Sequence, residues 1–388
     1  MNKSLYIVAF SLAFATTGIA QNNEGQDKVI DLGTQTTTEL RKTQAVSTIY
    51  SDELDKNATT SPYNAIYGLL PGLSVMQNTS WGTDKSRLNV RGRGSLNGDT
   101  PLFVVDGFAR PLEYINLSEI ESISVLKDGA ATALWGGRGA NGVVLITTKR
   151  GIYNKKDIKV DYKFGLGLPV DQPEFADAYT YAKARNEALR YDGLQPDMDE
   201  ASFLSGANSD LYPNVDWIDE TFKNTGISNK YTIEFRGGGN KFRYYTIVGL
   251  LTDKGFIKNA NMNDGYSTQD KYSRANLRSN LDIDLTNTTK LKLNILGTLA
   301  ESSRPGASAD LWNMVYSLPP SAFPVRTEDG TWGGNSTWAG TLNPVAQSQG
   351  AAYSKGHTRS LFADLTLSQD LSGFVKGLGV DLRLAYDN

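Results

Sequence analysis

The chain has 388 residues, and its 39 Lys and Arg residues nearly balance its 42 Asp and Glu residues, so the formal net charge is −3. This balance supplies no basic surface for a nucleic acid. Cysteine is absent, which excludes a disulfide framework in an exported chain. The length alone allows two or three domains.

The first twenty residues predict a secretory signal peptide. Lys3 is followed by an apolar stretch from Leu5 to Phe14 and by small residues that end at Ala20. The apolar stretch is too short to span a membrane as a helix, and the small residues are typical of a cleavage site. We therefore expect residues 1–20 to be removed before Gln21.

Residues 21–42 are polar and predict a flexible leader. The leader contains one short apolar island, KVIDLG, from Lys28 to Gly33. Two interpretations are open from the residues alone. The island consists either of incidental loop residues or of a strand-forming tag that another protein captures at the edge of a sheet.

Residues 43–150 predict a compact α+β unit. Asp128 is expected to cap a short helix, and Gly136 is expected to end that helix in a left-handed turn. Short apolar runs bounded by Gly, Pro and Asp predict strands within residues 88–94, 101–107, 120–128 and 143–149.

The segment after this helix contains Gly137, Gly139 and Gly142, which have the GxGxxG spacing of a dinucleotide site. In that fold the glycines follow a strand and open a helix. Here the order is reversed, because the helical residues precede the glycines and a β-branched run follows them. The glycines are therefore predicted to be structural and to allow close approach between a helix and a strand.

After about residue 158, apolar and polar residues alternate with a period of two. Tyr162 and Phe164 share one face while Asp161 and Lys163 share the other, and residues 276–285 repeat the pattern. We count about seven such strands, each with the roughly 9–11 residues that a tilted strand needs to cross a bilayer. Short and long connections alternate, which favours an outer-membrane β-barrel over a soluble sandwich.

The stretch from Pro101 to Gly151 closely resembles the plug-domain signature of the SusC/RagA family of TonB-dependent outer-membrane transporters. The resemblance continues through Tyr212–Phe222 and the segments after Tyr244, which look like the start of that family's barrel. The region around the KVIDLG island is similar to the family's TonB-box region. The resemblance thus gives a candidate TonB box of Lys28, Val29, Ile30, Asp31, Leu32 and Gly33. It also gives plug-signature positions Arg91, Gly92, Asp106, Gly107, Lys127, Asp128, Gly137, Arg138, Gly139, Asn141 and Gly142.

The resemblance implies an all-β-dominated membrane protein, in which a small α+β plug domain lies inside an antiparallel outer-membrane β-barrel of about 22 strands. It implies TonB-dependent nutrient transport, with the plug facing the periplasm of a Gram-negative cell. The implied partners are TonB, a SusD-like surface lipoprotein, outer-membrane lipid and an oligosaccharide or peptide cargo, with no nucleic acid. No catalytic residue, metal or cofactor is expected, and the single histidine, His357, cannot build a catalytic triad alone.

The expected organisation is a signal peptide at 1–20, a leader with the candidate TonB box (28–33) at 21–42, a plug domain at 43–150, and the first seven or so barrel strands at 151–388. The sequence stops at Asn388 within a predicted strand. An incomplete barrel leaves an open edge in lipid at a cost on the order of tens of kcal/mol. We therefore expect a portion of a longer transporter or the product of an interrupted gene.

Two other classes stay open as alternatives. A secreted β-rich enzyme acting on glycans would need paired carboxylates across a cleft. Asp106, Glu119 and Glu121 are the nearest candidates, although a solvated or plug-to-wall role is favoured for them. A structural surface protein is the second alternative, but the sequence lacks the repeats expected of one.

Overall fold

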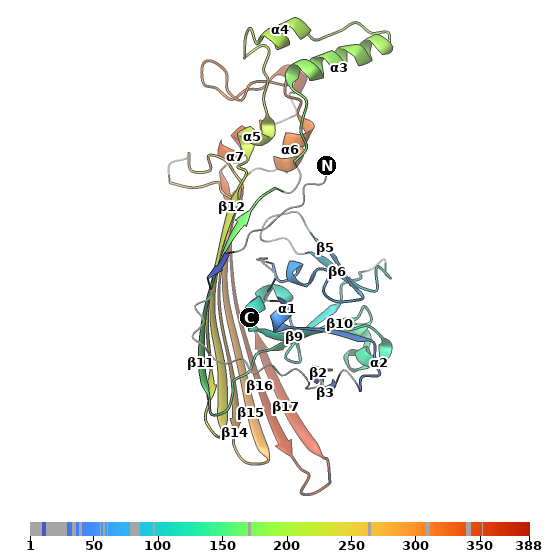
Figure 1. Ribbon diagram of the computed structural model, residues 1–388, viewed down its shortest axis with the longest axis vertical. Coiled ribbons are helices and arrows are strands. Elements are labelled where there is room, and N and C mark those ends of the chain that lie inside the picture. Colours follow the sequence, from blue (N-terminus) through green and yellow to red (C-terminus); the bar gives the residue numbers. More distant parts are fainter. Residues whose placement is uncertain are drawn as a thin grey trace.

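The computed structural model describes residues 10–12, 29–32, 36–38, 41–54, 56, 59, 61–77, 86–95, 98–169, 172–262, 265–306, 311–338, 343–350 and 352–388. Figure 1 shows a tall antiparallel sheet, a compact unit that lies against one face of this sheet, and a group of helices and loops beyond one end of it. The sheet is called the wall below, and the compact unit, which contains β4 to β10, is called the plug.

The wall contains eight strands in the order β1-β11-β12-β13-β14-β15-β16-β17, and each pairs antiparallel with its neighbours. Strands β11 to β17 are the seven predicted from alternation. Among the described residues, the edge strands β1 and β17 do not pair with each other. The strand bounds are β1 Phe10–Leu12, β11 Lys156–Gly167, β12 Gly226–Gly238, β13 Phe242–Lys254, β14 Lys271–Asp284, β15 Thr289–Pro305, β16 Tyr353–Asp370 and β17 Gly379–Asp387.

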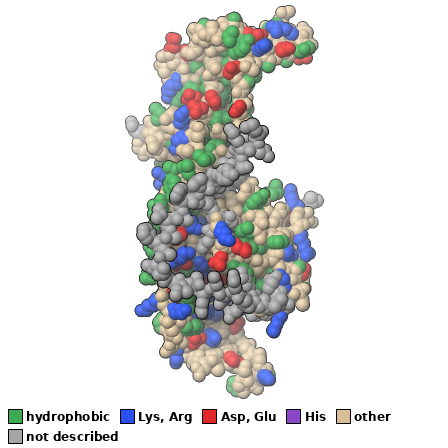
Figure 2. All heavy atoms as spheres, in the orientation of Figure 1, with side chains coloured by type: hydrophobic (Ala, Val, Ile, Leu, Met, Phe, Trp, Pro, Cys, Tyr) green, Lys and Arg blue, Asp and Glu red, His purple; other side chains and the backbone are tan. Residues whose placement is uncertain are grey.

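The two faces of the wall differ as the alternation predicts, because successive side chains of a strand point to opposite faces. The face away from the plug carries exposed apolar side chains on every long strand, such as Val160, Leu277 and Leu382, each half or more exposed. The face toward the plug carries buried polar side chains, such as Arg278 and Asn280. In the space-filling view, hydrophobic side chains gather along the side of the wall that faces away from the plug (Figure 2).

The plug is built on a five-stranded sheet in the order β4-β9-β10-β7-β8. Strand β10 pairs parallel with β7 and antiparallel with β9. The bounds are β4 Val46–Tyr50, β7 Leu102–Val105, β8 Phe108–Ala109, β9 Ile120–Leu126 and β10 Val143–Thr148, with a separate hairpin of β5 Leu73–Met76 and β6 Arg87–Val90. The short helices are α1 Ser51–Leu54, η1 Asn64–Ile66, η2 Leu112–Tyr114, η3 Leu117–Glu119, α2 Gly129–Thr132 and η4 Ala133–Gly139.

The plug has its own hydrophobic core on both faces of this sheet. On one face Ile123, Val125 and Ile146 pack against Leu54 and Ile66. On the other face Val104, Leu126 and Val143 pack together with Ile30 and Leu32 of the leader. The plug therefore owes its fold to apolar contacts within itself and not to the wall.

The leader is more ordered than the sequence predicts. Strand β2, Val29–Asp31, pairs antiparallel with β3, Thr36–Thr38, and places Ile30 fully inside the plug core. The expectation of a flexible leader is therefore wrong for these residues, because Ile30 and Leu32 point to the same side and bury their apolar surface there. Residues 13–28 and most of the predicted signal peptide lie outside the described residues.

The long connections of the wall carry helices. The first connection contains α3 Ala178–Tyr191, α4 Glu200–Ser205 and α5 Trp217–Thr221, and a later one contains α6 Leu311–Ser317, η5 Ser336–Trp338 and α7 Pro344–Gly350. The helices α4 and α5 are short, and the side chains of Asp199 and Asp216 cap their N-termini. Trp217, Phe323 and Val345 share one apolar cluster that joins the two connections. No helix among the described residues is long and apolar enough to cross a membrane.

The glycine-rich segment has the order predicted from the sequence, with helical residues before it and a strand after it. The side chain of Asp128 caps α2 by accepting a hydrogen bond from the N–H of Ala131 at 2.8 Å. Gly136 has the expected positive φ, but its ψ of −142° is not that of a left-handed turn, and a further 3-10 turn follows it. Gly142 has φ +89°, and a Cβ there would lie 2.8 Å from the Cβ of Val90. A Cβ at Gly139 would lie 3.1 Å from that of Trp135, so Gly139 and Gly142 are structural.

Replacing Gly142 by alanine is expected to lower the free energy of unfolding of the plug by about 1–3 kcal/mol, because the residue would have to hold a positive φ and push against Val90. Gly137→Ala is the matched control, since a Cβ at Gly137 meets no atom within 4 Å. Thermal melts of the detergent-solubilised protein measure both changes. Equal melting temperatures for the two variants would contradict the structural role of Gly142.

Candidate functional site

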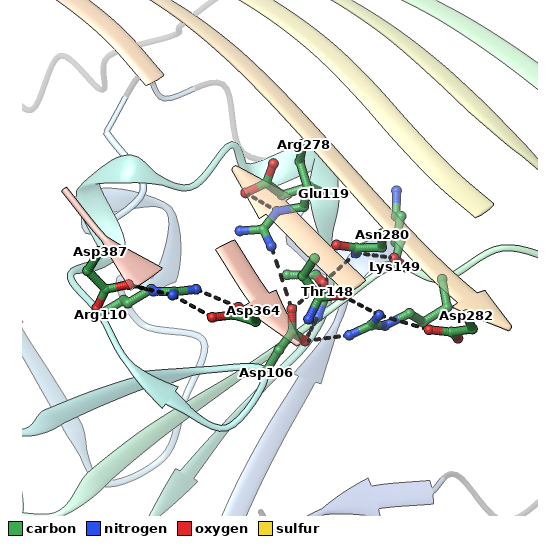
Figure 3. A network of polar contacts seen from close by, with 12 residues as sticks. Asp106, Arg110, Glu119, Thr148, Lys149, Arg278, Asn280, Asp282, Asp364 and Asp387 are labelled. Carbon is green, nitrogen blue, oxygen red and sulfur yellow. Dashed lines mark hydrogen bonds and ion pairs between the residues drawn. The ribbon is translucent and has the colours of Figure 1, made fainter. Parts of the chain in front are cut away.

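The plug meets the wall through a layer of charged and polar side chains gathered at one edge of the five-stranded sheet. Strands β7 and β10 are parallel, so the ends that carry Asp106 and Thr148 lie side by side. Strand β9 runs the opposite way, so Glu119, which precedes it, reaches the same edge. Figure 3 shows these side chains pointing toward β14, β16 and β17 of the wall. The interface is thus set by the topology of the plug sheet.

Arg278 of β14 lies at the centre of this layer. Its Nε is 3.1 Å from Oε1 of Glu119, and its Nη1 is 3.6 Å from Oδ2 of Asp106. The three side chains are at most 5 % exposed, so the two carboxylates share one buried guanidinium. A buried charge is tolerated only when it is paired, which makes Arg278 the counter-ion for both plug groups.

Asp106 occupies the two-residue turn between β7 and β8. Asp106 and Gly107 both have positive φ, 49° and 95°, as a tight hairpin turn requires. The carboxylate accepts hydrogen bonds from the backbone N–H of Thr148 at 3.0 Å and from its hydroxyl at 2.6 Å. Burial alone would raise the pKa of Asp106, but Arg150, Arg278 and Thr148 together hold it below its usual value. Asp106 is therefore an ionised anchor.

Glu119 behaves in the opposite way. It is completely buried, and Arg278 approaches it as an ion pair without an aligned hydrogen bond to either carboxylate oxygen. Burial therefore outweighs the nearby guanidinium and raises the pKa of Glu119 above its usual value. The layer thus contains one carboxyl group that favours ionisation and one that resists it.

In addition to the contacts made by Arg278 of the wall, two arginines of the plug bind aspartates of the wall. Arg150 Nη1 donates to Asp282 of β14 at 3.1 Å and to Asn294 of β15 at 2.6 Å. Arg110 forms a two-pronged pair with Asp364 of β16, at 2.6 Å and 2.5 Å. Arg110 also donates to Asp387 of β17 at 2.6 Å. Paired N–H donors of this kind fix both the position and the orientation of the plug.

Hydrogen bonds from Asn280, Arg274 and Asn276 to neutral acceptors of the plug complete the layer. The amide of Asn280 donates to the hydroxyl of Thr148 and to the carbonyl of Lys149, both at 2.9 Å. Arg274 donates to the carbonyl of Glu113 at 2.6 Å, and Asn276 donates to that of Tyr114 at 2.8 Å. These wall residues alternate along β14 with the apolar residues of its other face. Strand β14 therefore provides contacts over most of its length.

The structure brings only part of the predicted plug signature into this layer. Asp106 lies within it, and a Cβ at Gly107 would come within 3.2 Å of Arg383 of β17. The other signature residues are placed within the plug. Lys127 bonds the hydroxyl of Ser47 at 2.6 Å, and Asn141 bonds the carbonyl of Gly98 at 3.2 Å. Asp128, Gly137, Gly139 and Gly142 shape the α2–β10 connection, Arg91 and Gly92 form a positive-φ bend after β6, and Arg138 is exposed.

The candidate TonB box is only partly described, since Lys28 and Gly33 lie outside the described residues. Val29, Ile30 and Asp31 form β2, and its partner β3 occupies one edge of that strand. Ile30 is fully buried and Leu32 is 5 % exposed. The segment is therefore extended, as a strand-forming tag should be, but its apolar side chains are packed into the plug.

Sequence reasoning missed most of the wall partners. It assigned Arg278 and Asp282 to the polar face of a strand but gave them no partner, and it did not single out Arg110, Arg150 or Asp364. The signal for β14 was present, because charged residues alternate with apolar ones along a predicted membrane strand. The pairing itself depends on docking between segments more than one hundred residues apart.

Arg278→Gln is expected to destabilise the docked plug by about 3–5 kcal/mol, because it leaves Asp106 and Glu119 buried without their shared counter-ion. The measurement is the temperature at which the plug becomes sensitive to protease in detergent. Lys290→Gln is the control, since its ion pair with Asp284 is solvent-exposed and is worth at most about 1 kcal/mol. A similar small effect for both variants would refute the central role of Arg278.

Mild acidification is expected to stabilise the docked plug through Glu119. Its folded pKa lies above the unfolded value of about 4.3, so its contribution to stability falls as pH rises through the interval between the two. The contribution of Asp106 is lost only below about pH 3.9, since its folded pKa is lowered. The melting temperature of Glu119→Gln should therefore change less than that of the native protein above about pH 4.3. Parallel pH profiles would refute the raised pKa.

Comparison with known proteins supports the division into plug and wall. The family model described as TonB-dependent Receptor Plug Domain matches residues 38–143. TonB-dependent receptor P26 of Formosa agariphila is 26% identical over 363 residues, which cover 90% of this chain and 34% of that protein. TonB-dependent receptor SusC of Bacteroides thetaiotaomicron is 30% identical over 258 residues, 63% of this chain and 24% of that protein.

Solved structures share the fold at lower sequence identity. The RagAB peptide importer in its open-open state superposes with a TM-score of 0.70 and 20% identity, over 93% of this chain and 42% of that chain. The present chain therefore spans about a quarter to a third of these relatives and less than half of that structure. Residues 38–143 thus form a TonB-dependent receptor plug domain, and the chain as a whole is similar to TonB-dependent receptors of the SusC/RagA type.

Proposed function

We propose that the chain is the N-terminal part of a TonB-dependent transporter that imports a nutrient across the outer membrane. The observation that carries the proposal is the two-faced wall, which exposes apolar side chains on one side and buries charged ones against the plug on the other. A barrel strand in a membrane needs an apolar outer face and a polar lumen. The domain boundaries at residues 20, 42 and 150 belong to this proposal.

The orientation follows from the connections. The turns after β12, β14 and β16 are short, whereas the connections after β11 and β15 carry helices. In outer-membrane barrels the short turns face the periplasm and the long loops face outward. The plug facing the periplasm and the helical cluster facing outward are therefore our assignments. This cluster is where a SusD-like lipoprotein would dock.

The cargo is proposed to be an oligosaccharide or a peptide. SusC and a peptide importer are among the similar proteins, and each of these names describes the relative only. The buried carboxylates considered for an enzyme, Asp106 and Glu119, are bound by Arg278 at the plug–wall interface. This placement favours a transporter over the glycan-active alternative, in which paired carboxylates face a cleft.

TonB is proposed to capture residues 28–33 by strand addition, which uses the backbone of the captured strand. In the structure, β3 pairs with this strand, and the plug core holds Ile30 and Leu32. Capture therefore requires the segment to leave its pocket first. A force that TonB then exerts on residues 28–33 would act on a segment joined directly to the plug core.

Two substitutions at one position test this proposal. Ile30→Ala removes the buried side chain but keeps the backbone N–H, so the periplasmic domain of TonB should bind at least as well as it binds the native protein. Ile30→Pro removes the same packing and also the donor, so we expect binding to fall by about tenfold or more, and energised uptake with it. Surface plasmon resonance with the TonB domain compares the two. Equal binding by both variants would overturn the assignment of the box.

A further inference from the structure

A small cavity lies between the plug and the wall, beside the charged layer. Its volume is about 10 Å³, which is room for one species of the size of water. Strands β12, β13 and β14 supply its wall side, and the segment around η3 supplies most of its plug side. Each of these three strands is paired on both of its edges, so the cavity lies within the continuous part of the wall.

The register of the wall brings two cations to this cavity. Lys230 of β12 pairs with Leu251 of β13, and Leu251 pairs with Arg274 of β14. Directly paired residues share a face and a level, so the two cations stand on one row, with their backbones about 10 Å apart. Both side chains line the cavity, and no carboxyl group is among the described residues that line it. The next inward residue of β13, Asp253, is not one of them.

The guanidinium of Arg274 uses only part of its hydrogen-bonding capacity. Its Nη1 donates to the carbonyl of Glu113 at 2.6 Å. Its Nε is buried and has no hydrogen-bond partner among the described residues, and the whole residue is only 8% exposed. A buried donor of a charged group is costly when it is left unpaired. Arg274 therefore requires an acceptor that the described protein groups do not supply.

Two more donors lie around the same space. The ammonium of Lys230 donates to the hydroxyl of Ser118 at 3.1 Å, which uses one of its three N–H groups. The side-chain oxygen of Asn116 accepts from the N–H of Ser118 at 3.2 Å, and its amide nitrogen lies against Gly249 of the wall, where a Cβ would collide with it. The plug thus brings an amide, and the wall brings two cations, to one small cavity.

We propose that this cavity binds one chloride ion, which accepts hydrogen bonds from Arg274 Nε, the ammonium of Lys230 and the amide of Asn116. The ion joins the plug to β12 and β14 of the wall. The volume of the cavity excludes sulfate, phosphate and organic acids. Chloride is slightly larger than water, and the flexible stem of Lys230 can give the extra room. The inference goes beyond the proposed function and uses neither TonB nor cargo.

Charge decides between chloride and water. A water molecule could accept the bond from Arg274, but it would leave two positive charges facing one buried space. Repulsion between like charges is strong where solvent is excluded. An anion between Lys230 and Arg274 turns this repulsion into attraction on both sides, and the hydrogen bonds that it accepts are charge-assisted.

The first test exchanges gluconate for chloride at constant ionic strength, because gluconate is too large for the cavity. It uses the protein expressed from its own gene and purified in detergent. The measurement is the temperature at which the plug becomes sensitive to protease. Raising chloride from zero to about 0.5 M should raise this temperature by about 2–4 °C and then saturate, as expected for a ligand that binds only the docked state.

A pair of variants separates the cavity from the rest of the interface. Arg274→Gln should lose the chloride-dependent rise. Arg236→Gln is the matched control, since Arg236 of β12 donates to the carbonyl of Arg150 at 2.7 Å but does not line the cavity. Each variant loses one bond from a guanidinium to a plug carbonyl, and only Arg236→Gln should keep the full rise.

A second measurement locates the ion in the native protein and does not depend on the folding of any variant. Crystals grown with bromide in place of chloride should give an anomalous peak in the cavity, within hydrogen-bond distance of Arg274 Nε. A water molecule there without an anomalous signal would overturn the proposal.

The proposal would also be overturned if gluconate stabilised the docked plug as well as chloride does, or if Arg274→Gln kept the same chloride-dependent rise as Arg236→Gln. None of these measurements involves TonB or cargo. Failure of the chloride site therefore leaves the Ile30 test untouched, and the reverse also holds.

Discussion

The guanidinium of Arg278 lies between the carboxylates of Asp106 and Glu119, and through them it joins β14 of the wall to two ends of the plug sheet. The apolar clusters among the described residues lie within the plug or within the loop helices. The plug is therefore held mainly by charge pairs and hydrogen bonds. Such contacts specify position more than they add stability, since each buried ion has given up its hydration.

A polar interface also suits a unit that would have to move under the proposed function. Separating two apolar surfaces in water carries a large penalty that nothing in the solvent repays. Separated ions can regain their hydration, so the penalty for opening this layer is smaller than its many close contacts suggest. Because the plug keeps its own core, it can shift as an intact body and does not have to unfold.

Much of the architecture could be predicted from the sequence, because it depends on local patterns. The period of two located β11 to β17 and assigned their faces, and Asp128 marked the start of α2. The reversed order of helix and strand around Gly142 excluded a dinucleotide site. The misses have physical causes. The ψ of Gly136 depends on the 3-10 turn that follows it, and the burial of Ile30 depends on contacts with distant strands of the plug.

The charged layer could be predicted only in part, because its pairs join positions that the chain separates widely. Arg110 and Asp364 are 254 residues apart, and either residue alone looks like an ordinary solvated charge. The alternation showed that β14 turns polar side chains to the inside, but not which plug residue each one meets. That information lies in the docking geometry of two units that fold around separate cores.

The long distance along the chain between Arg110 and its wall partners also sets an order of assembly. Because Arg110 completes its contacts only with Asp364 and Asp387, the plug can be fully seated only after β16 and β17 have been made and paired. Contacts between such distant segments form slowly, since a long loop must close first. Until then the charged edge of the plug is exposed to water, and its charges oppose aggregation. The residues that hold the plug against the wall would thus also keep the plug, which is synthesised first, soluble while the rest of the chain is being assembled.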